Sequence, residues 1–168
     1  MIEMHPVESP ADIGVVAALA HDIWHPHYVP IIGLAQTDYM VAKFQSAAAI
    51  TRQMTEGYRY YLARKDGVAA GYFALVPDFR ENRALLSKLY VRPEQQGAGI
   101  GKAIIAFVEA QCTAMGIAEL WLTVNRNNTG SIAFYQRTGF TVAETLVQDI
   151  GSGFVMDDYK MVKALRRE

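Results

Sequence analysis

The residues with the clearest capacity for chemistry form a glycine-rich segment at positions 95–102, with the sequence QQGAGIGK. The segment follows an apolar run of strand type and opens an apolar helix, and its glycines allow backbone N–H groups to approach a ligand closely. At the N-terminus of a helix, those N–H groups and the helix dipole favour a phosphate group. The segment therefore predicts a cradle suited to a pyrophosphate.

Two well-known phosphate-binding motifs do not match this segment. The dinucleotide fingerprint needs a glycine where this chain has Lys102, and the P-loop needs Ser or Thr where this chain has Ala103. A nucleotide-phosphate enzyme with an NAD or ATP site of those types is therefore disfavoured. Taken alone, the segment is also open to a purely structural interpretation, in which its glycines serve only a tight strand-to-helix turn.

Residues 96–101 match the Q/R-x-x-G-x-G/A signature of the GNAT N-acetyltransferase superfamily. The residues before them, 89–94 (LYVRPE), are similar to the strand and lead-in of that family. Residues 124–140 (VNRNNTGSIAFYQRTGF) resemble its second motif, with Ser131 where alanine is more usual. Because the two motifs come in the right order and at the right spacing, together they are far more specific than a lone glycine loop.

The resemblance implies an α+β (mixed α/β) fold with a central mixed, mostly antiparallel sheet flanked by helices. It implies a parallel, splayed strand pair at 85–91 and 118–124, with acetyl-CoA as cosubstrate in the opening and no metal. Arg92 and Lys102 could add charge near the phosphates, although a solvated surface role is equally open for both. The cofactor contacts that the resemblance implies are Leu89, Tyr90, Val91, Gln96, Gly97, Ala98, Gly99, Ile100, Gly101, Lys102, Asn128 and Tyr135.

Acetyl transfer from a thioester to an amine needs a neutral amine, stabilisation of the oxyanion and a proton for the departing thiolate. Tyr135 matches the tyrosine that serves as general acid in the family, and a phenol is protonated at neutral pH. A tyrosine that only packs is the alternative. By resemblance, a backbone N–H near Leu89 or Val91 is the candidate oxyanion donor.

The general base is harder to identify from the sequence. Family members often carry a glutamate on the strand before the glycine loop, but residues 85–90 (LLSKLY) contain no carboxylate. A water relay or a distant residue would have to act instead. His25 and His27 titrate in the useful range but are expected to be plain surface residues. Asp157 and Asp158 should point to opposite faces of the last strand. One of them could attract a cationic acceptor, but we expect both to be in contact with solvent.

Aromatic residues and the single cysteine complete the set of candidates. Trp24, Tyr28, Tyr39 and Tyr61 could wall an acceptor pocket, although aromatic residues at such spacing more often belong to the core. Cys112 lies on the apolar stripe of the helix after the glycine loop, where a buried thiol is inert. Direct attack of the amine, without a covalent intermediate, is therefore favoured.

Periodicity and turn residues predict the elements that must position these groups. A first helix is expected to begin at Ser9-Pro10 or Asp12 and to end near Trp24, before an irregular loop at 25–34. The further predicted elements are a helix from Thr37 or Asp38 to Gly57, a hairpin of 58–64 and 68–76, a strand at 85–91, a helix at 99–115, a strand at 118–124, a short helix at 131–137, and strands at 141–148 and 154–162.

Length and composition restrict the classes of protein to which this chain can belong. The 168 residues, 51% apolar with a formal charge of -1, predict one N-acetyltransferase domain over 1–168 and no global positive field to attract nucleic acid or an anionic membrane. The single cysteine favours the cytoplasm, and neither an export signal nor a membrane span is visible. Residues 154–163 could pair across a two-fold axis as edge strands do, or could equally lie inside the sheet of one monomer, which leaves a homodimer open.

These observations favour an acetyl-CoA-dependent N-acetyltransferase that acts on a primary amine of a small molecule or a peptide. The alternative is a non-catalytic module that binds acyl-CoA for sensing or interaction, and the missing strand carboxylate is the feature that supports it. Release of thiol from acetyl-CoA in the presence of amines separates the two interpretations.

Overall fold

The computed structural model describes residues 1–165, which form seven strands, five α-helices and one short 3-10 helix. In chain order they are β1 (Ile2–Pro6), α1 (Pro10–Ile32), α2 (Leu34–Phe44), α3 (Ala47–Thr55), β2 (Arg59–Lys65), β3 (Val68–Asp78), β4 (Arg83–Val91), η1 (Pro93–Gln95), α4 (Ile100–Ala114), β5 (Glu119–Asn125), α5 (Thr129–Arg137), β6 (Thr141–Gly151) and β7 (Phe154–Ala164).

The strands follow the order β1-β2-β3-β4-β5-β7-β6 in one mixed sheet. β4 and β5 run parallel, with Arg83–Leu85 opposite Glu119–Trp121. The β1–β2, β2–β3, β5–β7 and β6–β7 pairs are antiparallel. The expected mixed, mostly antiparallel sheet with one parallel pair and flanking helices is confirmed.

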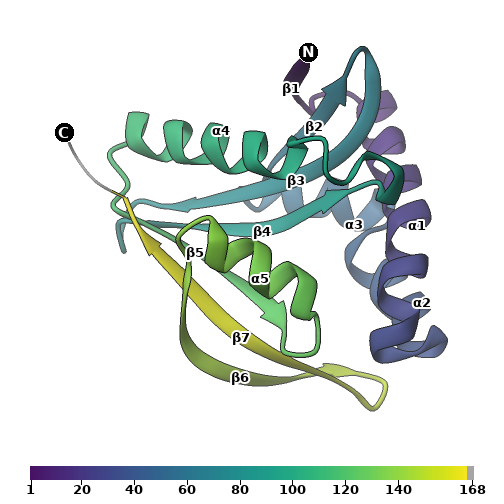
Figure 1. Ribbon diagram of the computed structural model, residues 1–168. Coiled ribbons are helices and arrows are strands. Elements are labelled where there is room, and N and C mark those ends of the chain that lie inside the picture. The colour runs from purple at the N-terminus through teal and green to yellow at the C-terminus, as the bar shows by residue number, and fades with distance from the viewer. Residues whose placement is uncertain (166–168) are drawn as a thin grey trace. The chain divides into compact units, whose positions relative to one another are not determined.

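The chain divides into two compact units. The first comprises Met1–Val76 and Lys88–Val108, and the second comprises Pro77–Ser87 with the described residues from Glu109 on. In the first unit, α1 and α2 run side by side (Figure 1) and both contact α3. Tyr60, Tyr72 and Phe73 are among its largest fully buried side chains, so aromatic rings fill much of its core.

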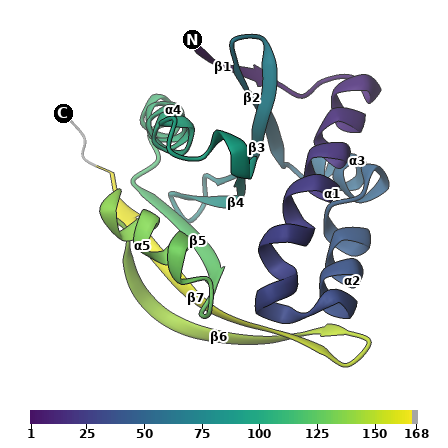
Figure 2. The same cartoon turned by 45° about the vertical axis from the view of Figure 1, so that its right-hand side comes forward.

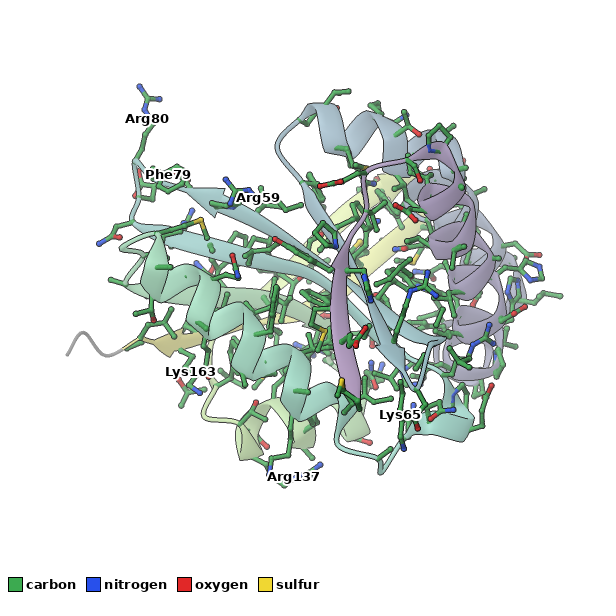
Figure 3. The ribbon with its side chains drawn as sticks, turned by 90° about the horizontal axis from the view of Figure 1, so that it is seen from above. Arg59, Lys65, Phe79, Arg80, Arg137 and Lys163 are labelled. Carbon is green, nitrogen blue, oxygen red and sulfur yellow. The ribbon has the colours of Figure 1, made fainter. Side chains whose placement is uncertain are left out.

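In the second unit, β6 and β7 form a long hairpin, and α5 lies against β5 and β7 (Figure 2). Lys163 of β7, which is labelled in Figure 3, identifies the face of β7 that lies toward α5. Its Nζ donates to the Thr138 carbonyl after α5 at 2.6 Å and forms an ion pair with Glu109 of α4. The face of β7 that carries Lys163 is therefore the one that faces α5.

α1 is longer than predicted, because it continues through Pro26 and Pro30 to Ile32. The prediction of a loop at 25–34 is therefore wrong. Each proline removes one backbone hydrogen bond and normally costs a helix about 3 kcal/mol. Both prolines lie on the exposed face, where water can reach the freed carbonyls, while Trp24 and Tyr28 bury the opposite face. Tertiary packing therefore outweighs the local signal.

The predicted helix ending at Gly57 is two helices, α2 and α3, that are separated at Gln45 and Ser46. Ser46 caps α3 by accepting a hydrogen bond from the backbone N–H of Ala49 at 3.2 Å. The strand β1 was not predicted. The start of α1 at Ser9 is confirmed, since Ser9 and Asp12 form a reciprocal capping box.

Candidate active site

The glycine-rich loop runs from η1 into α4 with two glycines in the left-handed region. Gly97 has φ 84° and Gly99 has φ 81°, and a Cβ placed on either residue would meet no atom within 4 Å. Glycine is therefore required here by backbone conformation and not by crowding. Open space over both residues leaves room for a ligand against the backbone.

The first turn of α4 carries backbone N–H groups that are available to a ligand. Its first helical hydrogen bond joins the Ala103 N–H to the Gly99 carbonyl at 3.0 Å. Across residues 1–165, no acceptor is found for the N–H groups of Ile100, Gly101 and Lys102, as is usual at a helix start. These donors and the positive end of the helix dipole fit an anionic group of phosphate chemistry.

The end of β4, which leads into this loop, is held tightly against β3. A Cβ on Gly71 would lie 2.4 Å from the Tyr90 carbonyl oxygen, so only glycine permits this approach. The Arg92 N–H donates to the Ala70 carbonyl at 2.8 Å. The Gln96 side chain reaches back to the Val91 carbonyl at 3.5 Å, which ties the loop to the strand.

The two candidate cations for the phosphates differ in their surroundings. The Arg92 guanidinium lies 3.5 Å from Asp22 and 3.8 Å from Glu94, and its Nε donates to the Ala69 carbonyl. Its charge is already neutralised locally. Lys102 is exposed on the first turn of α4 and has no ion-pair partner among the described residues, so its charge is the one available near the loop.

Lys88 is a residue that sequence reasoning missed. It shares the buried face of β4 with Ala84 and Leu86 and is only 6% exposed. Its Nζ donates to the Phe44 carbonyl at 2.6 Å and to the Gln53 Oε1 at 2.9 Å, and it also bonds the Tyr60 hydroxyl. Burial lowers the pKa of Lys88 to about 7. The signal was a lysine in line with Ala84 and Leu86, at a position of the strand that is otherwise apolar.

This cluster explains the break between α2 and α3. The Phe44 carbonyl, at the end of α2, is bonded by Lys88 and by the Gln53 side chain at 3.1 Å. Gln45 turns inward and accepts a hydrogen bond from the Tyr72 hydroxyl at 2.9 Å. A helix end that would otherwise carry unpaired buried groups is thereby satisfied.

Four aromatic rings of the first unit form one cluster beside β4. Tyr90 lies 5.3 Å from Trp24 and 5.4 Å from Tyr72 between ring centroids, and Trp24 lies 4.3 Å from Tyr28. Tyr61 stacks on Phe73 at 5.1 Å in a separate group, so the structure does not bring it together with Trp24 and Tyr28. Alternation along β2 sends Tyr60 and Tyr61 to opposite faces.

Tyr39 and the histidines of α1 lie near the α1–α2 pair. Tyr39 accepts a hydrogen bond from Lys43 Nζ at 3.3 Å. His25 lies on α1 and not in a loop, with its Nε2 2.6 Å from Asp38 of α2. The hydrogen bond with Asp38 raises the pKa of His25. His27 packs edge-on against Tyr28, with ring centroids 4.7 Å apart. The expectation that both are plain surface residues is wrong for His25.

In the second unit, Asn128 and Tyr135 belong to the β5–α5 connection and α5. Asn128 is buried at the N-cap of α5, and its N–H donates to the Asn125 carbonyl at 2.9 Å. Tyr135 is 8% exposed, with its ring 5.4 Å from Phe134 and 5.6 Å from Phe140. Neighbouring rings therefore fix the orientation of the Tyr135 side chain.

The acidic pair of β7 does not face solvent as a pair. Asp157 lies 3.0 Å from the Arg126 Nε, whereas Asp158 is 6% exposed. Burial, with a smaller contribution from Asp157, raises the pKa of Asp158 to about 6. Cys112 is fully buried, and burial with the nearby Glu109 raises the pKa of its thiol to about 11, so it is protonated at neutral pH.

Within 1–165, no group of three or more His, Cys, Asp and Glu side chains is arranged to hold a metal ion. None of the helices described has the length and apolar character needed to cross a membrane.

Comparisons with known proteins fit this arrangement. A spermidine N(1)-acetyltransferase of Thermoplasma acidophilum is 37% identical over 76 residues, 45% of each chain. A mycothiol acetyltransferase of Streptomyces coelicolor is 30% identical over 86 residues, 51% of this chain but 28% of that protein. The chain thus spans less than half of these relatives' length.

Solved structures share the fold over nearly the whole chain. The PaiA N-acetyltransferase of Thermoplasma acidophilum, crystallised with coenzyme A, superposes with a TM-score of 0.80 at 24% identity over 98% of this chain and 99% of that chain. The ribosomal-protein-S18-alanine N-acetyltransferase of Escherichia coli gives 0.75 at 19% identity over 100% and 96%. Residues 18–140 match the family model described as Acetyltransferase (GNAT) family, and the chain belongs to that family.

Proposed function

We propose that this protein is an N-acetyltransferase that moves the acetyl group of acetyl-CoA to a primary amine by direct attack. The observation that carries the proposal is the start of α4, where three consecutive N–H groups lack acceptors within 1–165 and follow two left-handed glycines. Membership of the GNAT family supports the same reaction. In this proposal residues 1–168 act as one N-acetyltransferase domain.

The roles of the residues follow the family resemblance. The N–H groups of residues 97–102 hold the pyrophosphate of acetyl-CoA, with Gln96 keeping the loop on β4. Backbone groups of Leu89 and Val91 bind the pantetheine arm beside Tyr90. Asn128 contributes a further contact, and Tyr135 protonates the departing thiolate. Because Cys112 is buried and protonated, no acyl-cysteine intermediate is needed.

The acceptor in this proposal is a small-molecule or peptide amine. Similar proteins are named for spermidine and for the alanine of ribosomal protein bS18. Tyr90, the one ring of the aromatic cluster beside β4 that is partly exposed, supports an acceptor with an apolar or cationic body, since ring faces attract both. Turnover should rise between about pH 7 and 9 as the acceptor amine loses its proton.

Location and further partners are proposed on sequence grounds. The single cysteine supports a cytoplasmic location, and the formal charge of -1 supports neither nucleic acid nor an anionic membrane as a partner. Residues 154–163 lie inside the sheet, as β7 between β5 and β6, and not at its edge, so they do not offer the edge pairing considered from the sequence. A homodimer would have to use another surface, and measurement of the molar mass in solution would test for one.

The binding step is tested by calorimetry with acetyl-CoA. Gly99→Glu and Gly101→Glu should abolish binding, because each places a carboxylate against the phosphates. Gly153→Glu is the matched control, since Gly153 also has a positive φ, 79°, and open space, but lies in the β6–β7 turn. If both loop variants keep their fold and bind acetyl-CoA with unchanged affinity, the proposal that this loop holds the pyrophosphate is wrong.

The catalytic step is tested by release of thiol from acetyl-CoA with a panel of amines that includes spermidine and an alanyl peptide. Turnover with any of them supports the proposal. Binding of acetyl-CoA without turnover on a broad amine panel would favour the non-catalytic sensing module, which the absence of a carboxylate in residues 85–90 also supports.

A further inference from the structure

The C-terminal end of α5 carries Tyr135, and the residues that follow the helix are tied to Tyr135 by several hydrogen bonds. The Tyr135 carbonyl accepts from the Thr138 N–H at 3.1 Å, the Thr138 hydroxyl at 2.9 Å and the Phe140 N–H at 3.0 Å. The Tyr135 ring also packs against Phe140, which is 2% exposed. The position of Tyr135 therefore depends on the position of residues 138–140.

Lys163 of β7 attaches this end of the helix to the sheet. Its Nζ donates to the Thr138 carbonyl at 2.6 Å, at the negative end of the helix dipole, where a cation is stabilised. A helix of nine residues such as α5 is too short to be stable by itself, so its place depends on contacts of this kind. The N-terminal end of α5 is anchored separately, because the Asn128 N–H donates to the Asn125 carbonyl of β5.

Two neighbours keep the Lys163 side chain in this place. Glu109 of α4 forms an ion pair with its Nζ, and the two side chains are only 24% and 29% exposed, so water screens the pair in part. Gly139, with φ 101°, leaves the space that the lysine chain occupies, since a Cβ there would lie 3.0 Å from the Lys163 Cε. A chain of contacts thus runs from Glu109 through Lys163 to the end of α5, and it lies entirely within the second compact unit.

We propose that Lys163 is a positioning residue of the acetyl transfer, which acts through Tyr135. The assignment rests on the proposed N-acetyltransferase function. As the C–S bond breaks, the sulfur takes the electron pair of that bond and the Tyr135 phenolic proton, and the phenolate then regains a proton from solvent. Lys163 gives and takes no proton in this step. Its cation fixes the end of α5, and with it the hydroxyl that donates.

Proton transfer is sensitive to small displacements of the donor. A general acid has to lie within hydrogen-bond reach of the atom that it protonates, and a displacement of about 1 Å can lower the rate about 10²-fold. Loss of the Lys163 ammonium would deprive the Thr138 carbonyl of this donor and Glu109 of its cation. The contact between β7 and α5 would then loosen three residues from Tyr135 along the chain.

The test compares wild type with Lys163→Met and Lys163→Arg on the amine panel. Lys163→Met keeps most of the apolar stem and removes the ammonium, so kcat should fall by about 10- to 10²-fold while the Kd of acetyl-CoA stays within about twofold of wild type. Lys163→Arg keeps a cation that can donate to Thr138 and pair with Glu109, and it should restore most of kcat.

Lys160→Met is the matched control for Lys163→Met. It removes a cation from the other face of the same strand, where the Lys160 Nζ lies over the Trp121 ring at 5.0 Å. It should retain turnover within about threefold of wild type, because an exposed cation of this kind contributes little.

A double-variant cycle separates positioning from a general loss of structure. If Lys163 acts only through the Tyr135 hydroxyl, Lys163→Met should have little further effect on kcat, within about twofold, once Tyr135→Phe has removed that hydroxyl. A general structural defect would lower kcat by the same factor in both backgrounds. Melting temperatures of all variants are measured alongside the kinetics.

Glu109→Gln keeps the test decisive if Lys163→Met does not fold. It leaves the lysine and its bond to the Thr138 carbonyl in place and removes only the ion pair, so kcat should fall by about three- to tenfold. This loss, too, should disappear in the Tyr135→Phe background.

Each contrary result identifies a different error. Absence of turnover by wild type with every amine overturns the proposed function and the assignment that rests on it. Normal turnover by Tyr135→Phe overturns the role of Tyr135 and with it that of Lys163. Wild-type kcat in Lys163→Met, an equal loss in Lys160→Met, or equal losses in the two backgrounds overturns the positioning role alone.

Discussion

Tyr135 can be tested at the scale of a single hydroxyl group. Tyr135→Phe keeps the ring that packs against Phe134 and Phe140 and removes only the phenolic proton. If that proton goes to the thiolate, kcat should fall by about 10²- to 10⁴-fold with little change in the affinity for acetyl-CoA. Steady-state kinetics and calorimetry measure the two quantities.

Phe134→Leu is the matched control for Tyr135→Phe, since it disturbs the same ring contacts without removing a proton donor. It should affect thermal stability more than kcat. Wild-type turnover in Tyr135→Phe would reassign the proton donor.

Cys112 should be dispensable for catalysis. Burial holds its thiol protonated at neutral pH, with a pKa of about 11, and direct attack needs no enzyme nucleophile. Cys112→Ala should keep its turnover and lose about 0.5–3 kcal/mol of unfolding free energy, because it leaves a small void in the core. A folded but inactive Cys112→Ala would instead favour an acyl-cysteine route.

At the scale of elements, the contact between β3 and β4 depends on Gly71. Gly71→Ala puts a Cβ 2.4 Å from the Tyr90 carbonyl oxygen, a backbone atom that cannot turn away. The strands must separate, which should lower the free energy of unfolding by about 1–3 kcal/mol and weaken acetyl-CoA binding through residues 89–91. Denaturant titration and calorimetry give both values.

Gly14→Ala is the matched control for Gly71→Ala. Gly14 lies in α1, where an added Cβ meets nothing within 4 Å. The substitution should raise the free energy of unfolding by about 0.5–1 kcal/mol and leave binding unchanged. Equal stability of the two variants would show that the β3–β4 contact is looser than described.

Most elements could be predicted from the sequence because their signals are local. The β2–β3 hairpin has a turn at Asp66-Gly67, and the glycine loop and α4 form one continuous pattern. The path of α1 through Pro26 and Pro30 could not be predicted, because it depends on which helix face the rest of the fold covers. The short β1 lacks a strong pattern and is fixed by pairing with β2.

The candidate site was predictable to a similar degree. Sequence motifs predict the glycine loop, Asn128 and Tyr135, but their roles stay predictions until binding and turnover are measured. Lys88 and Asp158 were missed as buried groups because burial depends on distant segments: the neighbours of Lys88 come from α2, α3 and β2. A polar residue at an apolar strand position was the only local signal for Lys88.

At the scale of the whole molecule, these two groups shape the dependence of stability on pH. The pKa of Asp158 rises from 3.8 to about 6 on folding, so the folded state binds more protons in that range and the free energy of unfolding falls as pH rises through it. The pKa of Lys88 falls from 10.5 to about 7, so the unfolded state binds more protons there and the free energy of unfolding rises with pH.

The free energy of unfolding, measured by chemical denaturation from pH 4 to 10, should therefore fall with pH in an acidic limb and rise with pH in an alkaline limb. Asp158 contributes to the first and Lys88 to the second, each with a slope of up to about 1.4 kcal/mol per pH unit. Asp158→Asn should flatten only the acidic limb, and Lys88→Met only the alkaline limb. A wild-type curve with neither limb, or variants that leave both limbs unchanged, would contradict the burial of these groups.

The buried Lys88 can also report local opening of the fold. An uncharged amine is the form that acylating reagents attack, but this one is enclosed by α2, α3 and β2, whereas Lys102 is exposed. In a timed labelling experiment read by mass spectrometry, Lys102 should react at once. Lys88 should react only when local opening breaks its hydrogen bonds to the Phe44 carbonyl and the Gln53 side chain. Its labelling rate would therefore report how often the segment around Lys88 opens.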